Sequence, residues 1–257
     1  MKQFLIRLGA CLGIISASLF FSPNLSSSSV SVFSLRPPAA IALTQDKILE
    51  KLSAVPVFAV TDAQGAPLVR STGSGQNAVA IFQVFISRRD ALGFIEELKK
   101  QDPNLGSTVQ LATVPLGKVY EIVQQNRDSN RLRVAFVPTQ QQVDSARAVL
   151  KASGQPEGEF RGVPLFLAKA GDDDRVLTLQ QGNDQAIPFF FTREDLQGML
   201  DQFKTQEPEL LRSVKIEVIP LESLLEAFRT DDDQFLDKVI LIPPRETVEF
   251  IQQSQPK

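Results

Sequence analysis

The strongest constraint on the fold of this 257-residue chain is an internal repeat. Residues 84–146 align with residues 189–251 at a constant offset of 105, and the alignment needs no gap. Identical residues recur along it, among them the pairs Arg88 and Arg193, Asp90 and Asp195, Pro115 and Pro220, and Pro138 and Pro243. Upstream, residues 55–58 resemble residues 163–166 after a small difference in loop length. Because self-similarity of this length marks a repeated structural unit, the sequence predicts two copies of one fold.

Each copy alternates short apolar strands with amphipathic helices. We expect strands at residues 55–60, 79–86, 109–114 and 132–137 in the first copy, and at 163–168, 187–191, 214–219 and 238–242 in the second. Helices are expected after the N-cap residues Ser87 and Thr192, after Pro115 and Pro220, and at residues 143–152, 245–253 and 44–52. This order predicts an α/β fold: a tandem duplication of a β-β-α-β-α-β-α unit, arranged with pseudo-twofold symmetry.

The two copies define the expected domain organisation. The segment between them contains Gly154, Pro156 and Gly158, residues that interrupt helices and strands. We therefore place an N-terminal α/β repeat at residues 43–153 and a C-terminal one at residues 163–257. Whether the copies form two domains or one fused sheet stays open at this point.

The first 42 residues have the character of a targeting segment. They contain no acidic residue, and the apolar run Leu8–Phe21 follows Lys2 and Arg7. That run is too short to cross a bilayer comfortably and is typical of a signal-peptide core, with cleavage expected after Ala42. The sequence thus predicts an exported protein without stable membrane insertion after cleavage. An uncleaved anchor is the alternative.

Composition excludes several kinds of chemistry. The chain has no His, no Trp and a single Cys, Cys11, which lies in the leader. It therefore has no Ser-His-Asp or Cys-His nucleophile, no His-bound metal and no Cys-x-x-Cys pair. Without residues 1–42 the formal charge falls from -3 to -6, and no clustered basic surface is visible, so no nucleic-acid partner is expected. These exclusions do not by themselves say what the protein does, and no cofactor is expected.

Local motifs support the same expectation. Gly73-Ser74-Gly75 is followed by a strand and not by a helix, so no helix N-terminus is available to bind a phosphate. The runs Asp172–Asp174 and Asp231–Asp233 lack the alternating ligands and distal Glu of a calcium loop. We interpret them as solvated loop residues, and no metal is expected.

The apolar strands are the more informative feature, because both faces of some of them are apolar. The sequence allows two interpretations: central strands buried on both faces, or one covered face and one open apolar groove that binds hydrophobic polypeptide. In the second interpretation the groove residues are Phe58, Phe82, Phe85, Phe166, Phe189 and Phe191.

An ordered series of short blocks resembles the Tic22-like family, the soluble component of the chloroplast inner-envelope translocon, and in particular its cyanobacterial members. The blocks are Val55–Phe58, Phe85–Ala91, Val114–Tyr120, Gly162–Phe166, Ile187–Thr192 and Leu241–Arg245. The resemblance covers nearly all of the chain after the leader. It implies a non-enzymatic protein that acts between two membranes, in the periplasm or thylakoid lumen, or in the intermembrane space of plastids.

The function that this resemblance implies is chaperone-like. The expected clients are unfolded preproteins or outer-membrane β-barrel precursors, and the expected partners are components of a translocon or a β-barrel insertase. Such a task needs apolar binding surface and no catalytic residue. Two other functions stay open: a periplasmic small-molecule binding protein, because duplicated α/β halves can enclose a cleft, and a carboxylate-dependent hydrolase.

Overall fold

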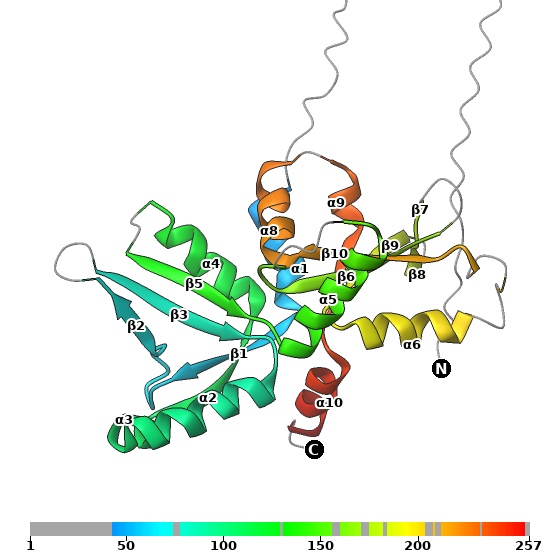
Figure 1. The fold of residues 1–257 in the computed structure, drawn as a ribbon. Coiled ribbons are helices and arrows are strands. Elements are labelled where there is room, and N and C mark those ends of the chain that lie inside the picture. The colour runs from blue at the N-terminus through cyan, green and yellow to red at the C-terminus, as the bar shows by residue number, and fades with distance from the viewer. Residues whose placement is uncertain are drawn as a thin grey trace, which may run out of the picture.

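The computed structural model describes residues 43–73, 78–128, 131–155, 160–170, 175–181, 184–203, 208, 212–231 and 233–254. The expected leader, residues 1–42, lies outside these, as do Ser74, Gly75 and Asp172–Asp174. Figure 1 shows two lobes, each built around one β-sheet, with α1 between them. Within the described residues, no helix has both the length and the apolar character needed to cross a bilayer.

The first lobe is a five-stranded mixed sheet covered by helices. Its elements are α1 (Gln45–Ser53), β1 (Pro56–Thr61), β2 (Val69–Thr72), β3 (Val79–Phe85), α2 (Arg88–Gln101), α3 (Pro103–Thr108), β4 (Gln110–Pro115), α4 (Leu116–Asn126), β5 (Leu132–Val137) and α5 (Gln140–Ala152). The central strand β3 pairs with β5 in parallel along one edge, and with β2 and β1 antiparallel along the other. Strand β4 pairs antiparallel with β1, so β4 and β5 lie at opposite sides of the sheet.

The second lobe repeats this arrangement. Its elements are β6 (Pro164–Ala170), β7 (Arg175–Val176), β8 (Leu179–Gln181), β9 (Asp184–Phe190), α6 (Arg193–Phe203), β10 (Lys215–Pro220), α8 (Leu221–Thr230), α9 (Phe235–Lys238), β11 (Val239–Ile242) and α10 (Arg245–Ser254). Strand β9 pairs in parallel with β11 and antiparallel with β6, which pairs antiparallel with β10. The four main strands therefore follow the same order in both sheets.

The register of the strands is repeated as well. Phe58 pairs with Phe85 in the first sheet, and their counterparts Phe166 and Phe190 pair in the second. The parallel pairs end at matching positions, Phe85 with Val137 and Phe190 with Ile242. The α/β class predicted from the sequence is confirmed. The repeated topology is compatible with the predicted duplication, and the twofold axis itself stays a prediction.

Both sheets contribute their inner faces to one hydrophobic core. The buried residues of this core come from α1, β1, β3 and α4 in the first lobe and from β6, β9, α8, α9 and β11 in the second. Phe228 of α8 and Leu52 of α1 are fully buried in it, and so is Leu165 of β6. Since apolar area from both halves is removed from water in one place, each half stabilises the other.

The outer faces are covered by an exchange of helices. The outer face of the second sheet packs against α6 and against α5, which belongs to the first copy, through Ala146 and Val149. The outer face of the first sheet packs against α2 and against α10 of the second copy, through Phe250. Figure 1 shows α5 over the second lobe and α10 beside α2. The last helix of each copy thus completes the hydrophobic core of the other.

Local sequence signals correspond to the observed helix ends. The hydroxyl of Ser87 accepts a hydrogen bond from the backbone N–H of Asp90 at 3.3 Å, and the Thr139 hydroxyl caps α5 in the same way through Gln142 at 3.3 Å. Helix α2 ends at Gln101, before Pro103, and that proline then opens α3 because a missing N–H is tolerated in a first turn. The short elements β2, β7, β8, α3 and α9 carry too little periodicity to predict.

The shared core predicts that the two lobes unfold together. Tyr120, the only tyrosine, lies on α4 of the first lobe and is buried in the shared core, whereas Leu196 is fully buried on the far side of the second sheet. Replacing Leu196 with Ala leaves a cavity and is expected to lower the free energy of unfolding by about 2–5 kcal/mol. During urea unfolding, the transition followed by Tyr120 fluorescence should show the full decrease in the free energy of unfolding. It should coincide with the transition followed by circular dichroism. An unchanged Tyr120 transition would show that the lobes unfold independently.

Candidate functional site

The six phenylalanines considered as groove residues are all in the interior. Phe58 and Phe166 are 0% exposed, Phe189 and Phe191 2%, Phe82 3% and Phe85 4%. Phe82, Phe189 and Phe191 lie in the shared core, while Phe58, Phe85 and Phe166 lie under the exchanged helices. The open-groove interpretation of these rings is therefore corrected: both faces of their strands are covered, and none of the six lines a solvent-open groove.

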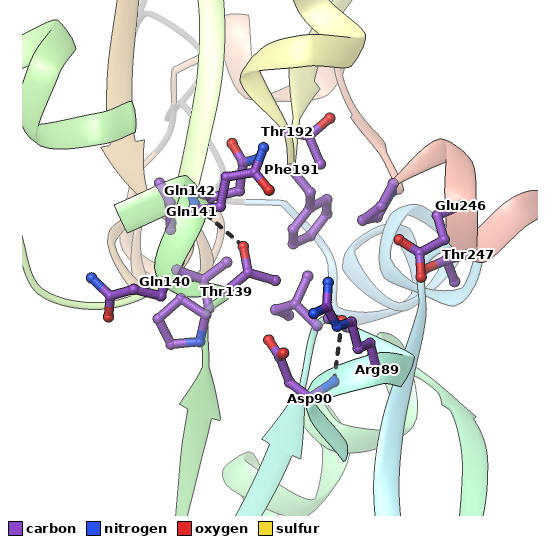
Figure 2. A pocket seen from close by; sticks show the side chains of 16 residues that line it. Arg89, Asp90, Thr139, Gln140, Gln141, Gln142, Phe191, Thr192, Glu246 and Thr247 are labelled. Atoms are coloured by element: carbon purple, nitrogen blue, oxygen red, sulfur yellow. Dashed lines mark hydrogen bonds between the residues drawn. The ribbon is translucent and has the colours of Figure 1, made fainter. Parts of the chain in front are cut away.

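A small cavity of about 270 Å³ lies where the two copies meet (Figure 2). Its lining includes matching residues of both copies: Ile86 with Phe191, Ser87 with Thr192, Gln141 with Glu246, and Gln142 with Thr247. The cavity is at the lower limit of small-molecule pockets, which measure roughly 300–1,000 Å³. It is built from the N-terminal ends of α2, α5, α6 and α10.

Several backbone N–H groups at this junction have partners from the chain itself. Besides Ser87 and Thr139, the Thr192 hydroxyl accepts from Asp195 N at 3.2 Å, and the Asp195 carboxylate accepts from Arg245 N at 3.1 Å. Gln142 accepts from Arg193 N at 2.9 Å and donates to Glu194 at 2.7 Å. Helix N-termini bind anions through free N–H groups, so these caps make the cavity a structural junction between the copies.

The acidic loop residues within the described part of the chain act as turn caps. The Asp231 carboxylate accepts a hydrogen bond from the Thr230 hydroxyl at 2.9 Å, and the Asp233 carboxylate accepts from Phe235 N at 2.9 Å. Among the described residues, no group of His, Cys, Asp and Glu side chains could hold a metal ion.

Among the described strands, β5 has one unpaired edge, as β4 and β10 do at the other sides of their sheets, and the edge of β5 lies between the two lobes. Arg131 O accepts from Ala80 N at 2.8 Å, and Val137 O accepts from Ile86 N at 3.2 Å, so the odd-numbered residues of β5 direct their backbone groups toward β3. Because backbone groups alternate in direction along a strand, those of Leu132, Val134 and Phe136 point to the other side. Over the part of the chain that is described, β5 pairs with no strand but β3.

This edge faces a groove of about 560 Å³ between the two lobes. One wall is α4, with the buried Tyr120 and the half-buried Val123, and the other is α8, with the buried Leu225. Strand β5 contributes the five consecutive residues Leu132 to Phe136. At about 3.3 Å per residue, this stretch corresponds to roughly 16 Å of extended chain. The groove therefore combines an unpaired strand edge with apolar walls.

The corresponding edge of the second sheet is capped at its start by a side chain. There, the ammonium group of Lys51 in α1 donates to Asp237 O at 2.6 Å and to Val239 O at 3.0 Å. Asp237 and Val239 are the counterparts of Leu132 and Val134 at the offset of 105. Burial of the Lys51 amine lowers its pKa from the ordinary value. The duplication thus provides two matching edges, of which one is capped by a lysine and the other opens on a groove.

Charged residues lie around the open groove. Arg127 of α4 and Glu226 of α8 approach to 3.7 Å across its rim, and Glu226 also pairs with Arg229. Glu222 lies deeper and accepts from Val163 N at 3.1 Å. Its carboxylate fits closely against Gly162, which has φ of +93° and at which a Cβ would come within 2.3 Å of Glu222 Oε2. The rim is charged, and beneath it the carboxylate of Glu222 lies among apolar residues.

Sequence reasoning placed a strand at residues 132–137 but did not identify its edge as a site. No local signal identifies this edge as open, because that depends on which distant segments pack beside the strand. The one relevant signal is outside the repeat: the helix that contains Lys51 precedes the first copy only.

The chain matches one protein-family model and is similar to solved structures. Residues 1–255 match the family model described as the Tic22-like family. The solved structure "Anabaena Tic22 (protein transport)" is 32% identical, covers 84% of this chain and 99% of its own, and superposes with a TM-score of 0.72. "Tic22 from Plasmodium falciparum" is 20% identical, covers 80% of this chain and 96% of its own, with a TM-score of 0.64, and shares the fold. No curated protein matches the sequence.

The groove carboxylate Glu222 predicts a pH dependence of stability. Burial raises the pKa of Glu222 above its ordinary value of 4.5, opposed by backbone hydrogen bonds. As the pH rises above 4.5, the unfolded state releases this proton before the folded state does, so Glu222 lowers the free energy of unfolding through that window. Glu222→Gln should reduce the loss of stability between about pH 4.5 and pH 7, measured by urea unfolding. Exposed Glu50→Gln is the control, and equal pH profiles for both variants would contradict the assignment.

Proposed function

The chain belongs to the Tic22-like family, and on that premise we propose that it serves protein transport as a chaperone-like carrier of unfolded polypeptide. A member of the family that shares 32% of its residues with this chain is described as a protein-transport protein. The single observation that carries the proposal is the unpaired edge of β5, which opens on an apolar groove while its counterpart in the second copy is capped by Lys51.

An unpaired strand edge selects its ligand by the conformation of the ligand's backbone. An extended segment that lies along β5 would pair with the backbone N–H and C=O groups of Leu132, Val134 and Phe136. Backbone pairing of this kind does not depend on the client's sequence, whereas the apolar walls favour clients with apolar side chains at alternate positions. Both properties suit a carrier with many clients.

Strands of β-barrel precursors have this alternating pattern, with apolar residues on one face and polar residues on the other. Outer-membrane β-barrel precursors and unfolded preproteins are therefore the client classes that we propose. A translocon or a β-barrel insertase is the component that would supply or receive them.

The proposed activity is non-enzymatic and takes place outside the cytoplasm. Holding an extended segment in a groove needs hydrogen-bond donors and acceptors and apolar contacts, but no bond-making step. The signal-peptide character of residues 1–42 supports export to the periplasm or thylakoid lumen. The rest of the chain has no cysteine and therefore needs no disulfide in such an oxidising compartment.

The proposal is tested by removing one outward-facing backbone donor from β5. Val134→Pro deletes an N–H that points into the groove and leaves the hydrogen bonds between β5 and β3 in place. Binding of a denatured β-barrel protein, followed as suppression of its aggregation after dilution from urea, should weaken by about tenfold, because the client loses a backbone hydrogen bond and its register.

Val134→Thr is the matched control, since it changes the side chain at the same position and keeps the N–H. It should retain most of the activity of the parent chain. Equal activity of the Pro and Thr variants, with both folded by circular dichroism, would exclude strand pairing at β5. No suppression of aggregation by the unmodified chain would exclude the carrier function.

A further inference from the structure

The groove that faces the edge of β5 (the β5 groove) corresponds, under the repeat, to the place that helix α1 occupies. Helix α1 packs against α4 at Gly117, where an added Cβ would lie 2.8 Å from Ser53 Oγ, and it contacts the edge of β11 through Lys51. At the offset of 105, Glu222 is the counterpart of Gly117, and it lines the β5 groove together with strand β5, the counterpart of β11. Helix α1 therefore shows what the matching place holds when it is filled.

Glu222 replaces a hydrogen-bond acceptor that α1 supplies in the first copy. There, Val55 N donates to Leu52 O in the last turn of α1 at 3.1 Å, whereas in the second copy Val163 N donates to Glu222 Oε2 at 3.1 Å. The side chain of Glu222 also stands where Gly117 has none, so a helix cannot approach α8 as closely as α1 approaches α4. The β5 groove therefore suits an extended chain better than a helix.

Among the described residues, no lysine or arginine forms an ion pair with the carboxylate of Glu222, whereas the nearby Arg127 and Arg229 pair with Glu226 at the rim. Burial raises the pKa of Glu222, and a neighbouring cation would have the opposite effect. A carboxylate accepts about four hydrogen bonds, of which Val163 N supplies one. A half-buried carboxylate without a counter-ion carries a desolvation cost that a bound cation would offset.

The matching edge of the second sheet shows that this place can bind an amine. The ammonium group of Lys51 donates there to Asp237 O at 2.6 Å and to Val239 O at 3.0 Å. Leu132 and Val134 are the counterparts of these two residues, and both line the β5 groove with their backbone groups directed away from β3. The same arrangement of carbonyls thus binds a lysine side chain in one copy and faces a groove in the other.

We propose that the β5 groove selects extended client segments that carry a lysine or arginine among apolar residues, and that Glu222 recognises the positive charge. This inference rests on the proposed carrier function and names the class of client. The client's cation binds the Glu222 carboxylate, and a carbonyl of β5 can share it, because each carbonyl accepts two hydrogen bonds. The apolar neighbours of the cation contact α4 and α8. A client with a carboxylate at this position is rejected, since two like charges would meet.

The test compares three fluorescein-labelled peptides that differ only in their central residue. Each has about nine residues, roughly 30 Å of extended chain, in which Val and Thr alternate on either side of a central Lys, Met or Glu. Their affinity for the full chain is measured by fluorescence anisotropy at about 0.15 M salt, which screens charges more than roughly 8 Å apart. The Lys peptide should bind about tenfold more tightly than the Met peptide, and the Glu peptide more weakly than both.

Glu222→Gln keeps an acceptor for Val163 N and removes the charge. This variant should bind the Met peptide as the parent chain does, which shows that the groove is intact, and should prefer Lys over Met by less than about twofold. Glu50→Gln is the matched control, because it removes the same charge from an exposed position on α1. It should keep the full preference of the parent chain.

Equal affinity of the parent chain for the Lys and Met peptides would overturn the inference and leave the carrier function standing, whereas no binding of any peptide would exclude both. The same loss of preference in Glu222→Gln and Glu50→Gln would contradict the role of Glu222 in favour of overall charge. Tighter binding of a peptide with the sequence of α1, residues 45–53, would overturn the inference in favour of a helical occupant. A dimer of the parent chain that the Lys peptide dissociates would overturn it in favour of a second copy.

Discussion

The molecule depends on one shared hydrophobic core, to which each copy of the repeat contributes a sheet face that it cannot cover alone. Tyr120 of the first copy and Phe228 of the second belong to the same buried cluster, and the last helix of each copy packs on the outer face of the other sheet. A single copy would expose its inner face and lack a helix on its outer face. The burial that stabilises the fold is therefore available only when both copies are present.

Because the scaffold is duplicated, the differences between its halves indicate where function resides. One helix, α1, precedes only the first copy, and its Lys51 caps the edge of β11 at its start while the matching edge of β5 stays open. The last helices differ as well: α10 buries one residue, Thr247, whereas α5 buries four.

Local features of the fold could be predicted because they depend on nearby residues. Ser87 and Thr139 cap helices in the expected positions, and Pro103 marks the end of α2. The repeat itself predicted the matching topology of two sheets. These signals involve side chains and backbone groups within a few positions of each other, so they can be read without knowing the tertiary structure.

The location of open surface could not be predicted, because it depends on segments that are far apart in the sequence. An apolar strand has the same pattern whether its second face meets solvent or a helix, and the covering helix comes from the other copy. Phe58 is covered by Phe250, almost two hundred residues away. Likewise, Val239 O is capped by Lys51 because α1 packs on β11, whereas the matching position Val134 lies at an open edge.

Burial of the phenylalanines means that the proposed carrier function does not rely on an exposed row of aromatic rings. An exposed row of aromatic rings attracts any apolar surface, including another copy of the protein. The N–H and C=O groups of an open strand edge bind water when no client is present, so the edge is tolerated in the free protein. Charged side chains near a strand edge hinder pairing between identical copies. Here Arg133 is exposed on β5, and Arg127 and Glu226 form an ion pair at the rim of the β5 groove. These charges lie where the proposed extended client would approach the edge.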